Sequence, residues 1–274
     1  MTGVDAVAPE DRYDAHPVAP CGTGVLLLAG SSGRIETARA DLLAAHGARV
    51  RAIRWFGGAG QRPSPHEVPV ELFLAQLEAL RGECDRLAVF GSSFGAEAAL
   101  VVAGLERLDA TVAVAPSSVV WSGFHDGDRS SHWTLGGSPV PAVPFASDWT
   151  PQTDPPEFVS LYESSLDLDP ETTAAATIPV ERIAGEVLLI AGGDDRVWPS
   201  IRFAQEIAKR RRAHGLDTEV VSEPDAGHRL LLPGEASVSG GVRMGRGGSP
   251  EADARLGARA WPRIARVLRL ATSE

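Results

Sequence analysis

The stretch VFGSSFGAEAAL, residues 89–100, places a serine between two glycines directly after a short apolar run. A G-x-S-x-G pattern indicates a nucleophilic serine when it follows a buried strand and opens a helix, because the serine then stands on a sharp turn above the sheet. Gly91 and Gly95 fit such a turn, since strand and helix approach too closely there for larger side chains. The pattern alone is a weak indicator, because glycine makes up 29 of the 274 residues.

Short apolar runs alternate with helical patterns along the chain. Runs of this kind are typical of strands buried on both faces, and the predicted strands are 24–30, 49–56, 86–91, 110–118, 186–193 and 218–223. Helices are predicted within 31–50, over 68–82 and 93–108, and near 199–214 and 250–270. This alternation predicts an α/β fold, a doubly wound and mostly parallel sheet with helices on both faces.

Residues 119–178 differ in composition from the segments on either side. They are rich in Pro, Ser and Asp, and they hold seven of the chain's 16 aromatic residues. Aromatic residues are scarce in disordered segments, so we predict a cap that is inserted into a single domain spanning 1–274 and supplies an apolar pocket. Trp121 and Trp198 are predicted to line this pocket. The alternative is an insertion packed on its own aromatic side chains.

Composition and charge exclude several classes of partner. With 43% apolar and 23% charged residues, the chain has the composition of a soluble globular protein. Its net charge of −10 argues against nucleic acid as a partner, because a polyanion would be repelled. No apolar run approaches the ~20 residues that span a bilayer, so no membrane association is expected. The acidic, proline-broken residues 1–20 are not expected to be a signal peptide.

The two cysteines, Cys21 and Cys84, lie far apart in the sequence and belong to no CxxC or Cys/His cluster. Neither a disulfide framework nor a structural zinc is therefore expected. We predict two reduced thiols, a cytoplasmic location, and a site with neither metal nor bound cofactor. Nothing in the sequence indicates an oligomeric state.

A serine hydroxyl becomes a nucleophile when a histidine, itself oriented by a carboxylate, can take its proton. In a doubly wound sheet these partners belong on loops after later strands, in the order serine, acid, histidine. Asp195 follows the fifth predicted strand and His228 follows the sixth. The carboxyl ends of such strands are where these sheets bind their ligands. We therefore predict a catalytic triad of Ser93, Asp195 and His228.

Two of these positions have a competitor. Asp194 is the neighbour of Asp195, but a G-x-x-D-x-x-x-P spacing over 192–199 resembles the acid loop of many α/β-hydrolases and favours Asp195. Asp194 is then expected to cap the loop or support the acid. His125, in the cap, is the one serious rival to His228.

Catalysis also requires backbone N–H groups aimed at the oxygen on which negative charge develops. One donor is expected from Phe94, the residue after the serine, and the other from Ser31 or Ser32 in the loop GSSG (30–33). The alternative for GSSG is a plain strand-to-helix turn.

Six stretches carry a family resemblance when they are taken in order along the chain. They are RADLLAAHGARVRAIRWFG (39–57), HEVPVE (66–71), GSSFGAEAAL (91–100), IPVERIAGEVLLIAGGDDRVWPS (178–200), AGHRL (226–230) and GGSPEADARLGARAWPRIARVL (247–268). Together they resemble the C-terminal catalytic domain shared by acyl-CoA thioesterases and bile-acid-CoA:amino-acid N-acyltransferases. The resemblance implies an α/β-hydrolase fold, with Ser93 as nucleophile, Asp195 as acid and His228 as base. It also implies attack on an acyl thioester and release of the acyl group to water or to an amine.

The chain departs from this family in three respects. Long members carry an N-terminal β-sandwich domain, whereas only residues 1–23 precede the first predicted strand here. The residue after the nucleophile is often Lys in the family and is Phe94 in this chain. The predicted cap has no basic cluster for coenzyme A phosphates. Basic residues nearer the acid loop and beyond are interpreted as scattered surface charge; they are Arg196, Arg202, Arg229, Arg243 and Arg246.

The resulting prediction is a serine hydrolase that cleaves a small-molecule acyl thioester through an acyl-enzyme on Ser93. A carboxylesterase or dienelactone-hydrolase-like enzyme would use the same residues on an oxygen ester, and acyl transfer to an amine is a third reading. The carrier of the acyl group, whether coenzyme A, another pantetheine carrier or a plain alcohol, stays open. A non-catalytic binding protein of this fold would be expected to lack one triad member, and all three are present.

Overall fold

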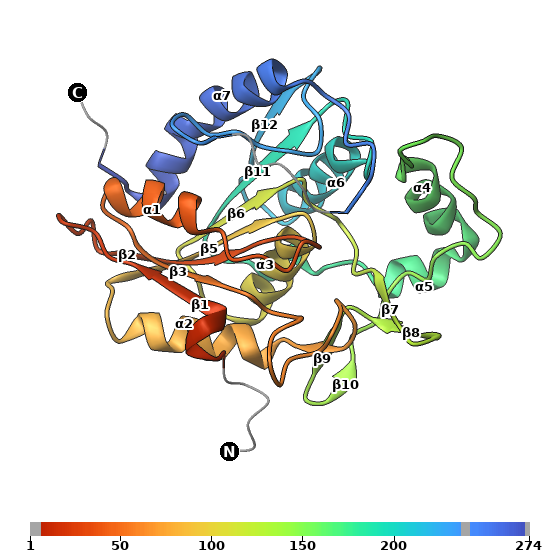
Figure 1. Ribbon diagram of the computed structural model, residues 1–274, viewed down its shortest axis with the longest axis horizontal. Helices are drawn as coiled ribbons and strands as arrows, with labels where there is room; N and C mark the ends of the chain where they lie inside the picture. Colours follow the sequence, from red (N-terminus) through yellow and green to blue (C-terminus); the bar gives the residue numbers. More distant parts are fainter. Residues whose placement is uncertain (1–6, 237–241, 272–274) are drawn as a thin grey trace.

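The computed structural model describes residues 7–236 and 242–271. A seven-stranded sheet runs through its centre in the order β1-β3-β2-β5-β6-β11-β12 (Figure 1). The strands are β1 (Arg12–Ala15), β2 (Thr23–Leu28), β3 (Arg49–Ile53), β5 (Arg86–Ser92), β6 (Ala110–Val114), β11 (Glu186–Gly192) and β12 (Glu219–Glu223). Only β1 is antiparallel to its neighbour; the other pairs are parallel. The predicted α/β architecture with a mostly parallel sheet is confirmed.

Helices cover both faces of this sheet (Figure 1). On one face lie α2 (Glu71–Arg81), α3 (Phe94–Leu105) and α6 (Ser200–Ala213), and on the other lie α1 (Thr37–Ala45) and α7 (Pro250–Leu268). Successive residues of β2 show the reason for an unbroken apolar run: Leu26 packs toward the first group and Leu27 toward the second. In the described part of the chain, no helix is long and apolar enough to cross a membrane.

Residues 119–178, the predicted cap, lie together at one side of the sheet (Figure 1). Their elements are β7 (Ser122–His125), β8 (Asp128–Ser131), β9 (Trp133–Leu135), β10 (Ser138–Pro139), α4 (Val159–Leu168) and α5 (Pro170–Ala175). Strands β7 and β8 form an antiparallel hairpin, and β10, β9 and β4 (Val68–Pro69) form a small sheet. Two 3₁₀ turns, Pro9–Asp11 and Val180–Arg182, complete the assignment. The cap therefore shares a sheet with β4, a segment that precedes it in the chain.

Several boundaries differ from the predictions. The segment RYDA of β1 was not predicted, because it has no apolar run; Asp14 holds it to β3 through an ion pair with Arg51 (2.8 Å). The helix predicted over 68–82 begins at Glu71, since Val68–Pro69 pairs with β9. The strand predicted over 110–118 ends at Val114. The first two differences arise from pairing between distant segments, whereas β6 ends where Ala115 adopts a positive φ of 46°.

The helical spacing of Ile35, Ala38, Leu42 and Ala45 suggests that they form the buried side of this helix. The structure buries a different side of α1. Ala38 and Ala45 are exposed, and the buried residues are Arg39, Ala40, Leu43 and Ala44. Arg39 can be buried because its guanidinium is paired with Glu235 (2.7 Å). A charged residue thus takes a core position. Gly47 follows the helix with a φ of 104°, as expected of a residue that ends it.

Glu97 ties the cap to the main sheet from a fully buried position on α3. One of its oxygens, Oε1, accepts hydrogen bonds from Trp133 Nε1 (2.7 Å), His132 Nδ1 (3.1 Å) and the backbone N–H of Trp121 (3.2 Å). All three donors belong to the cap. Because a buried carboxylate is tolerated only when it is hydrogen-bonded, Glu97 and the cap strands require each other.

Replacing Glu97 by alanine should therefore destabilise the whole protein. The change leaves three buried donors without their acceptor, and we expect the free energy of unfolding to fall by about 3 kcal/mol or more. Urea denaturation followed by tryptophan fluorescence measures this loss. Glu78→Ala, at a carboxylate on α2 whose side chain is 76% exposed, is the control and should change stability by less than about 0.5 kcal/mol. Equal midpoints for the two variants would contradict the anchoring role.

Candidate functional site

Ser93 stands on the turn between β5 and α3 with φ 57° and ψ −124°. This conformation is strained for a residue with a side chain and costs on the order of 1–3 kcal/mol. Glycines make the turn possible: a Cβ on Gly95 would lie 2.5 Å from the carbonyl oxygen of Ala29, and one on Gly91 would overlap the carbonyl oxygen of Gly95. The backbone N–H of Ser93 donates to Val114 on the neighbouring strand (2.9 Å), so the turn is fixed to the sheet.

The structure brings Ser93, His228 and Asp195 into one hydrogen-bonded chain. Ser93 Oγ lies 2.9 Å from His228 Nε2, and His228 Nδ1 lies 2.8 Å from Asp195 Oδ2. The other carboxylate oxygen, Oδ1, accepts from the backbone N–H groups of Val197 (2.9 Å) and Trp198 (3.4 Å). Because a carboxylate only accepts, the ring proton of a neutral His228 belongs on Nδ1. Nε2 is then free to take the serine proton.

The two competing residues lie elsewhere. Asp194 accepts from Arg196 Nε (3.0 Å) and from the backbone N–H of Gly248 (2.8 Å), and these contacts lower the pKa of its carboxyl. It therefore fastens the loop before α7, and the aspartate that contacts His228 is Asp195. His125 sits on the β7–β8 hairpin beside Asp126 (3.5 Å).

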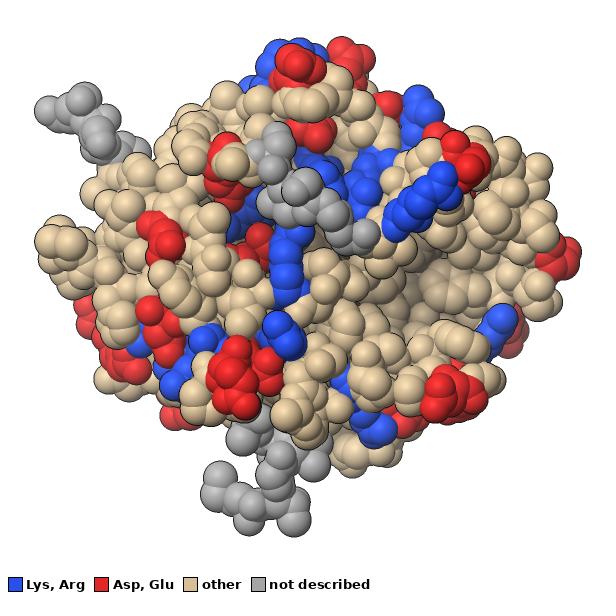
Figure 2. Space-filling model, in the orientation of Figure 1, with Lys and Arg blue, Asp and Glu red and all other residues tan. Residues whose placement is uncertain are grey.

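A cavity of about 690 Å³ opens at Ser93, on a face that Figure 2 shows hollowed beside a group of basic side chains. One side of the cavity is aromatic and apolar, and it is built mainly by the cap. Its residues include Phe124, Phe145, Phe158, Leu161 and Tyr162. The volume and lining suit a small molecule with an apolar portion. In residues 7–236 and 242–271, no three or more His, Cys, Asp or Glu side chains are grouped so that they could hold a metal ion.

Trp121 and Trp198 do not line this cavity, which corrects the expectation for both. They are fully buried behind its wall. Trp121 stacks on Phe145 with ring centroids 5.5 Å apart, and Trp198 lies 5.4 Å from Tyr162 and 5.6 Å from Phe94. The indoles therefore support the rings that face the cavity. A sequence can indicate that aromatic residues gather in one region, but it does not indicate which ring faces the cavity.

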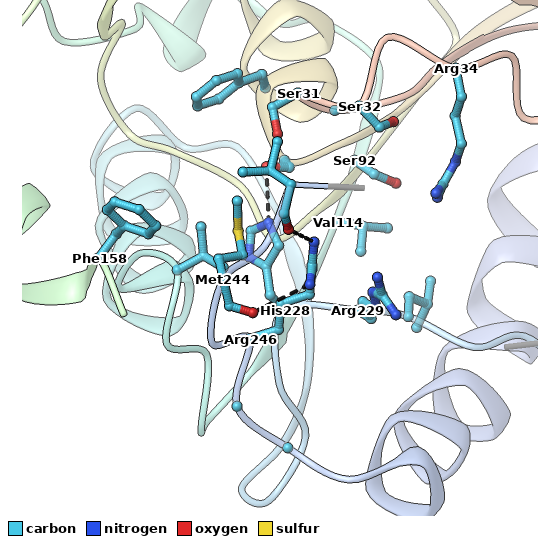
Figure 3. Close-up of a pocket in the computed structure, with 18 of the residues that line it drawn as sticks. Ser31, Ser32, Arg34, Ser92, Val114, Phe158, His228, Arg229, Met244 and Arg246 are labelled. Atoms are coloured by element: carbon cyan, nitrogen blue, oxygen red, sulfur yellow. Dashed lines mark hydrogen bonds between the residues drawn. The ribbon is translucent and has the colours of Figure 1, made fainter. Parts of the chain in front are cut away.

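The expected oxyanion donors lie beside the serine. Phe94 begins α3, and within the described residues its N–H has no acceptor; the same holds for the N–H groups of Ser31 and Ser32. Both serines line the cavity close to the nucleophile turn (Figure 3). A Cβ on Gly30 would lie 2.8 Å from the Cβ of Ser93, so this loop is packed against the turn. The arrangement leaves backbone donors available on one side of Ser93 Oγ.

Two polar contacts that were not predicted hold the loop that carries His228. Arg39 forms a bidentate ion pair with Glu235, through Nε (2.7 Å) and Nη2 (2.8 Å). Asp253, at the start of α7, accepts from the backbone N–H of Gly227 (2.9 Å), and burial raises the pKa of its carboxyl. Arg39 and Glu235 are 196 positions apart. No local signal in the sequence could have paired them.

Solved structures share the fold. The protein resembles a Klebsiella pneumoniae protein assigned as a dienelactone hydrolase, with a TM-score of 0.57 and 17% identity over 94% of this chain and 92% of that chain. It also resembles a Pseudomonas aeruginosa protein assigned as a hydrolytic enzyme, with a TM-score of 0.51 and 16% identity over 94% of this chain and 88% of that chain. At such identities the likeness concerns the fold alone. The predicted α/β-hydrolase fold is confirmed.

Proteins related in sequence are more informative about the family than the solved structures are. The chain is 26% identical to rat acyl-coenzyme A thioesterase 1 over 81% of this chain and 52% of that protein. It is 27% identical to human acyl-coenzyme A thioesterase 6 (88% and 58%) and to mouse acyl-coenzyme A amino acid N-acyltransferase 2 (77% and 49%). The chain thus spans about half the length of these relatives.

Residues 71–273 match the family described as "BAAT / Acyl-CoA thioester hydrolase C terminal". The match covers most of the chain and includes Ser93, Asp195 and His228. It confirms the family resemblance that the sequence motifs carry. The chain belongs to the BAAT / acyl-CoA thioester hydrolase C-terminal family.

Proposed function

We propose that this protein hydrolyses acyl thioesters through an acyl-enzyme on Ser93. The observation that carries the proposal is the hydrogen-bonded chain from Ser93 Oγ through His228 to Asp195, at the floor of a partly apolar cavity. In the first step Ser93 Oγ attacks the carbonyl carbon while His228 Nε2 takes the hydroxyl proton, and Asp195 stabilises the imidazolium. The N–H groups of Phe94 and of Ser31 or Ser32 hold the oxyanion.

The remaining steps return Ser93 to its starting state. The tetrahedral intermediate collapses, the carbon–sulfur bond breaks, and His228 gives its proton to the leaving thiolate. Water then attacks the acyl-serine ester while His228 takes one of its protons, and the second collapse releases the carboxylic acid and restores the serine hydroxyl. This sequence uses no metal and no bound cofactor.

Two observations support a thioester as the substrate. The relatives are named as acyl-coenzyme A thioesterases or as an acyl-coenzyme A amino acid N-acyltransferase, which all act at an acyl thioester. The cap side of the cavity offers aromatic and apolar side chains, among them Phe158 and Leu161, along which an acyl chain can lie. The cytoplasmic location expected from the sequence stays a prediction.

A fluorophosphonate probe tests the nucleophile directly. At neutral pH we expect the probe to label Ser93, identified by mass spectrometry of the modified peptide, and His228→Ala to abolish labelling. Ser93→Ala should lower kcat for a p-nitrophenyl ester by about 10⁴-fold or more. Ser92→Ala is the neighbouring-serine control and should still be labelled. A fully active Ser93→Ala would exclude the mechanism.

The adjacent aspartates form a matched pair for the acid. Asp195→Asn removes the carboxylate that accepts from His228 Nδ1, and we expect kcat to fall by about 10³–10⁴-fold. Asp194→Asn keeps an amide oxygen for Arg196 or Gly248 and should cost less than about tenfold. Steady-state kinetics on one ester substrate compares them. A larger loss for Asp194→Asn would reverse the assignment.

Matched substrates separate thioester hydrolysis from its alternatives. For hexanoyl groups on a thiol and on the corresponding alcohol, we expect a higher kcat/KM for the thioester, with free hexanoate as the product. Because one relative is named as an N-acyltransferase, the assay is repeated with glycine or taurine. A preference for the oxygen ester would indicate a carboxylesterase or dienelactone-hydrolase-like enzyme, and amide formation would indicate acyl transfer.

A further inference from the structure

Four arginines line the cavity. Arg39 is paired with Glu235, and the other three, Arg34, Arg229 and Arg246, lie on the side that the cap does not build. They come from the loop after β2, from the residue after His228 and from the loop before α7, and their side chains point toward a common space (Figure 3). Basic side chains also gather at the hollow of this face in Figure 2. The interpretation of Arg229 and Arg246 as scattered surface charge is therefore wrong.

The other three arginines of that interpretation are engaged outside this cluster. Arg196 pairs with Glu157 and Asp194, Arg202 pairs with Glu206 on α6, and Arg243 pairs with Asp154. These are solvent-exposed ion pairs of small energetic consequence. None of these three arginines lines the cavity at Ser93.

Arg246 has backbone partners only, within the described residues. Its guanidinium donates to the carbonyl oxygens of Val242 (2.6 Å) and Met244 (3.3 Å) and has no carboxylate partner there. These contacts hold the guanidinium in place without neutralising it. Burial, and then the charges of Arg229 and Arg34, lower the pKa of Arg246.

Two acidic side chains of the cavity have hydrogen-bond partners outside the arginine group, and the charge of Arg229 also acts on one of them, Asp253. Glu235 is bound at both oxygens by Arg39, and Asp253 accepts from the backbone of Gly227. Glu36 pairs with Arg34 through Nε (2.7 Å), and among residues 7–236 and 242–271 the terminal nitrogens of Arg34 have no hydrogen-bond acceptor. A cluster of cations that repel one another at a cavity wall is stabilised by a ligand that brings negative charge.

The cluster lies next to the proton carrier of the site. Arg229 directly follows His228, and the carbonyl oxygen of Arg246 accepts from the backbone N–H of His228 (2.8 Å). The aromatic side chains of the cap form the opposite part of the wall. A molecule whose carbonyl carbon reaches Ser93 therefore meets apolar side chains on one side and guanidinium groups on the other.

We propose that Arg34, Arg229 and Arg246 form a subsite for an anionic group of the substrate, a phosphate or a carboxylate. Guanidinium groups bind both through paired, charge-assisted hydrogen bonds. The anion belongs either to the carrier of the acyl group or to the far end of the acyl group itself. The identity of the substrate rests on the proposed function, but anion binding can be measured without turnover.

Calorimetric titration of the full chain carrying Ser93→Ala tests the subsite with two matched pairs of probes. Coenzyme A against pantetheine reports phosphates on the carrier. The glutaryl against the pentanoyl thioester of N-acetylcysteamine reports a carboxylate on the acyl group. We expect at least one anionic member to bind ten times or more tightly than its neutral counterpart. Adding Arg246→Gln should remove most of this preference, whereas Arg246→Lys should retain part of it.

Arg212→Gln is the control, because Arg212 is an exposed arginine on α6 outside the cavity; it should leave the preference unchanged. Preference within the first pair places the anion on the carrier, and preference within the second places it on the acyl group. Equal binding of charged and neutral probes, or a preference that survives Arg34→Gln and Arg246→Gln together, overturns the subsite. If the subsite binds anions but the unmodified protein cleaves no ester or thioester, the proposed function fails and the subsite stands.

Discussion

The close approach of β5, the Ser93 turn and α3 is the constraint on which the site depends. Gly91 and Gly95 allow backbone to touch backbone there, and Ser93 must adopt φ 57° to connect the two elements. A strained turn persists only when the surrounding structure determines it. Here β6 binds the turn through the hydrogen bond from Ser93 N–H to Val114, and the slim, alanine-rich α3 packs beneath it. The same turn places Ser93 and Phe94, the first residue of α3, at the wall of the cavity.

Buried polar contacts then fix the parts that the sheet cannot reach. Glu97 accepts hydrogen bonds from three donors of the cap. The ion pair of Arg39 with Glu235 holds the loop of His228 against α1. Such contacts add little net stability, because removing charges from water offsets most of their attraction. They select one arrangement, however, since any displaced loop would leave a buried charge without a partner. The cap wall and the histidine are therefore held in one position relative to Ser93.

The sequence was informative where function depends on local pattern. Parallel strands end at a common edge, so residues that directly follow β5, β11 and β12 had to lie near one another, and the structure brings Ser93, Asp195 and His228 together there. The sequence was uninformative where the residues in contact lie far apart along the chain. The edge strand β1 is held by ion pairs, and the buried side of α1 depends on Glu235, 196 positions away. Trp121 and Trp198 were expected to line the pocket, but they lie behind Phe145 and Tyr162, an order that follows only from packing in three dimensions.

The arginine cluster is likewise built from residues that are distant in the sequence. It bears on which substrates could react at Ser93. An apolar wall distinguishes acyl groups weakly, because each methylene contributes only about 1 kcal/mol. Guanidinium groups that lack a carboxylate partner, such as Arg246 within the described residues, impose a sharper requirement, since a neutral ligand would bury them without compensation. Because Arg246 and His228 share a backbone hydrogen bond, an anion bound there would also steady the loop that carries the proton. Selectivity and positioning of the histidine would then have the same physical source.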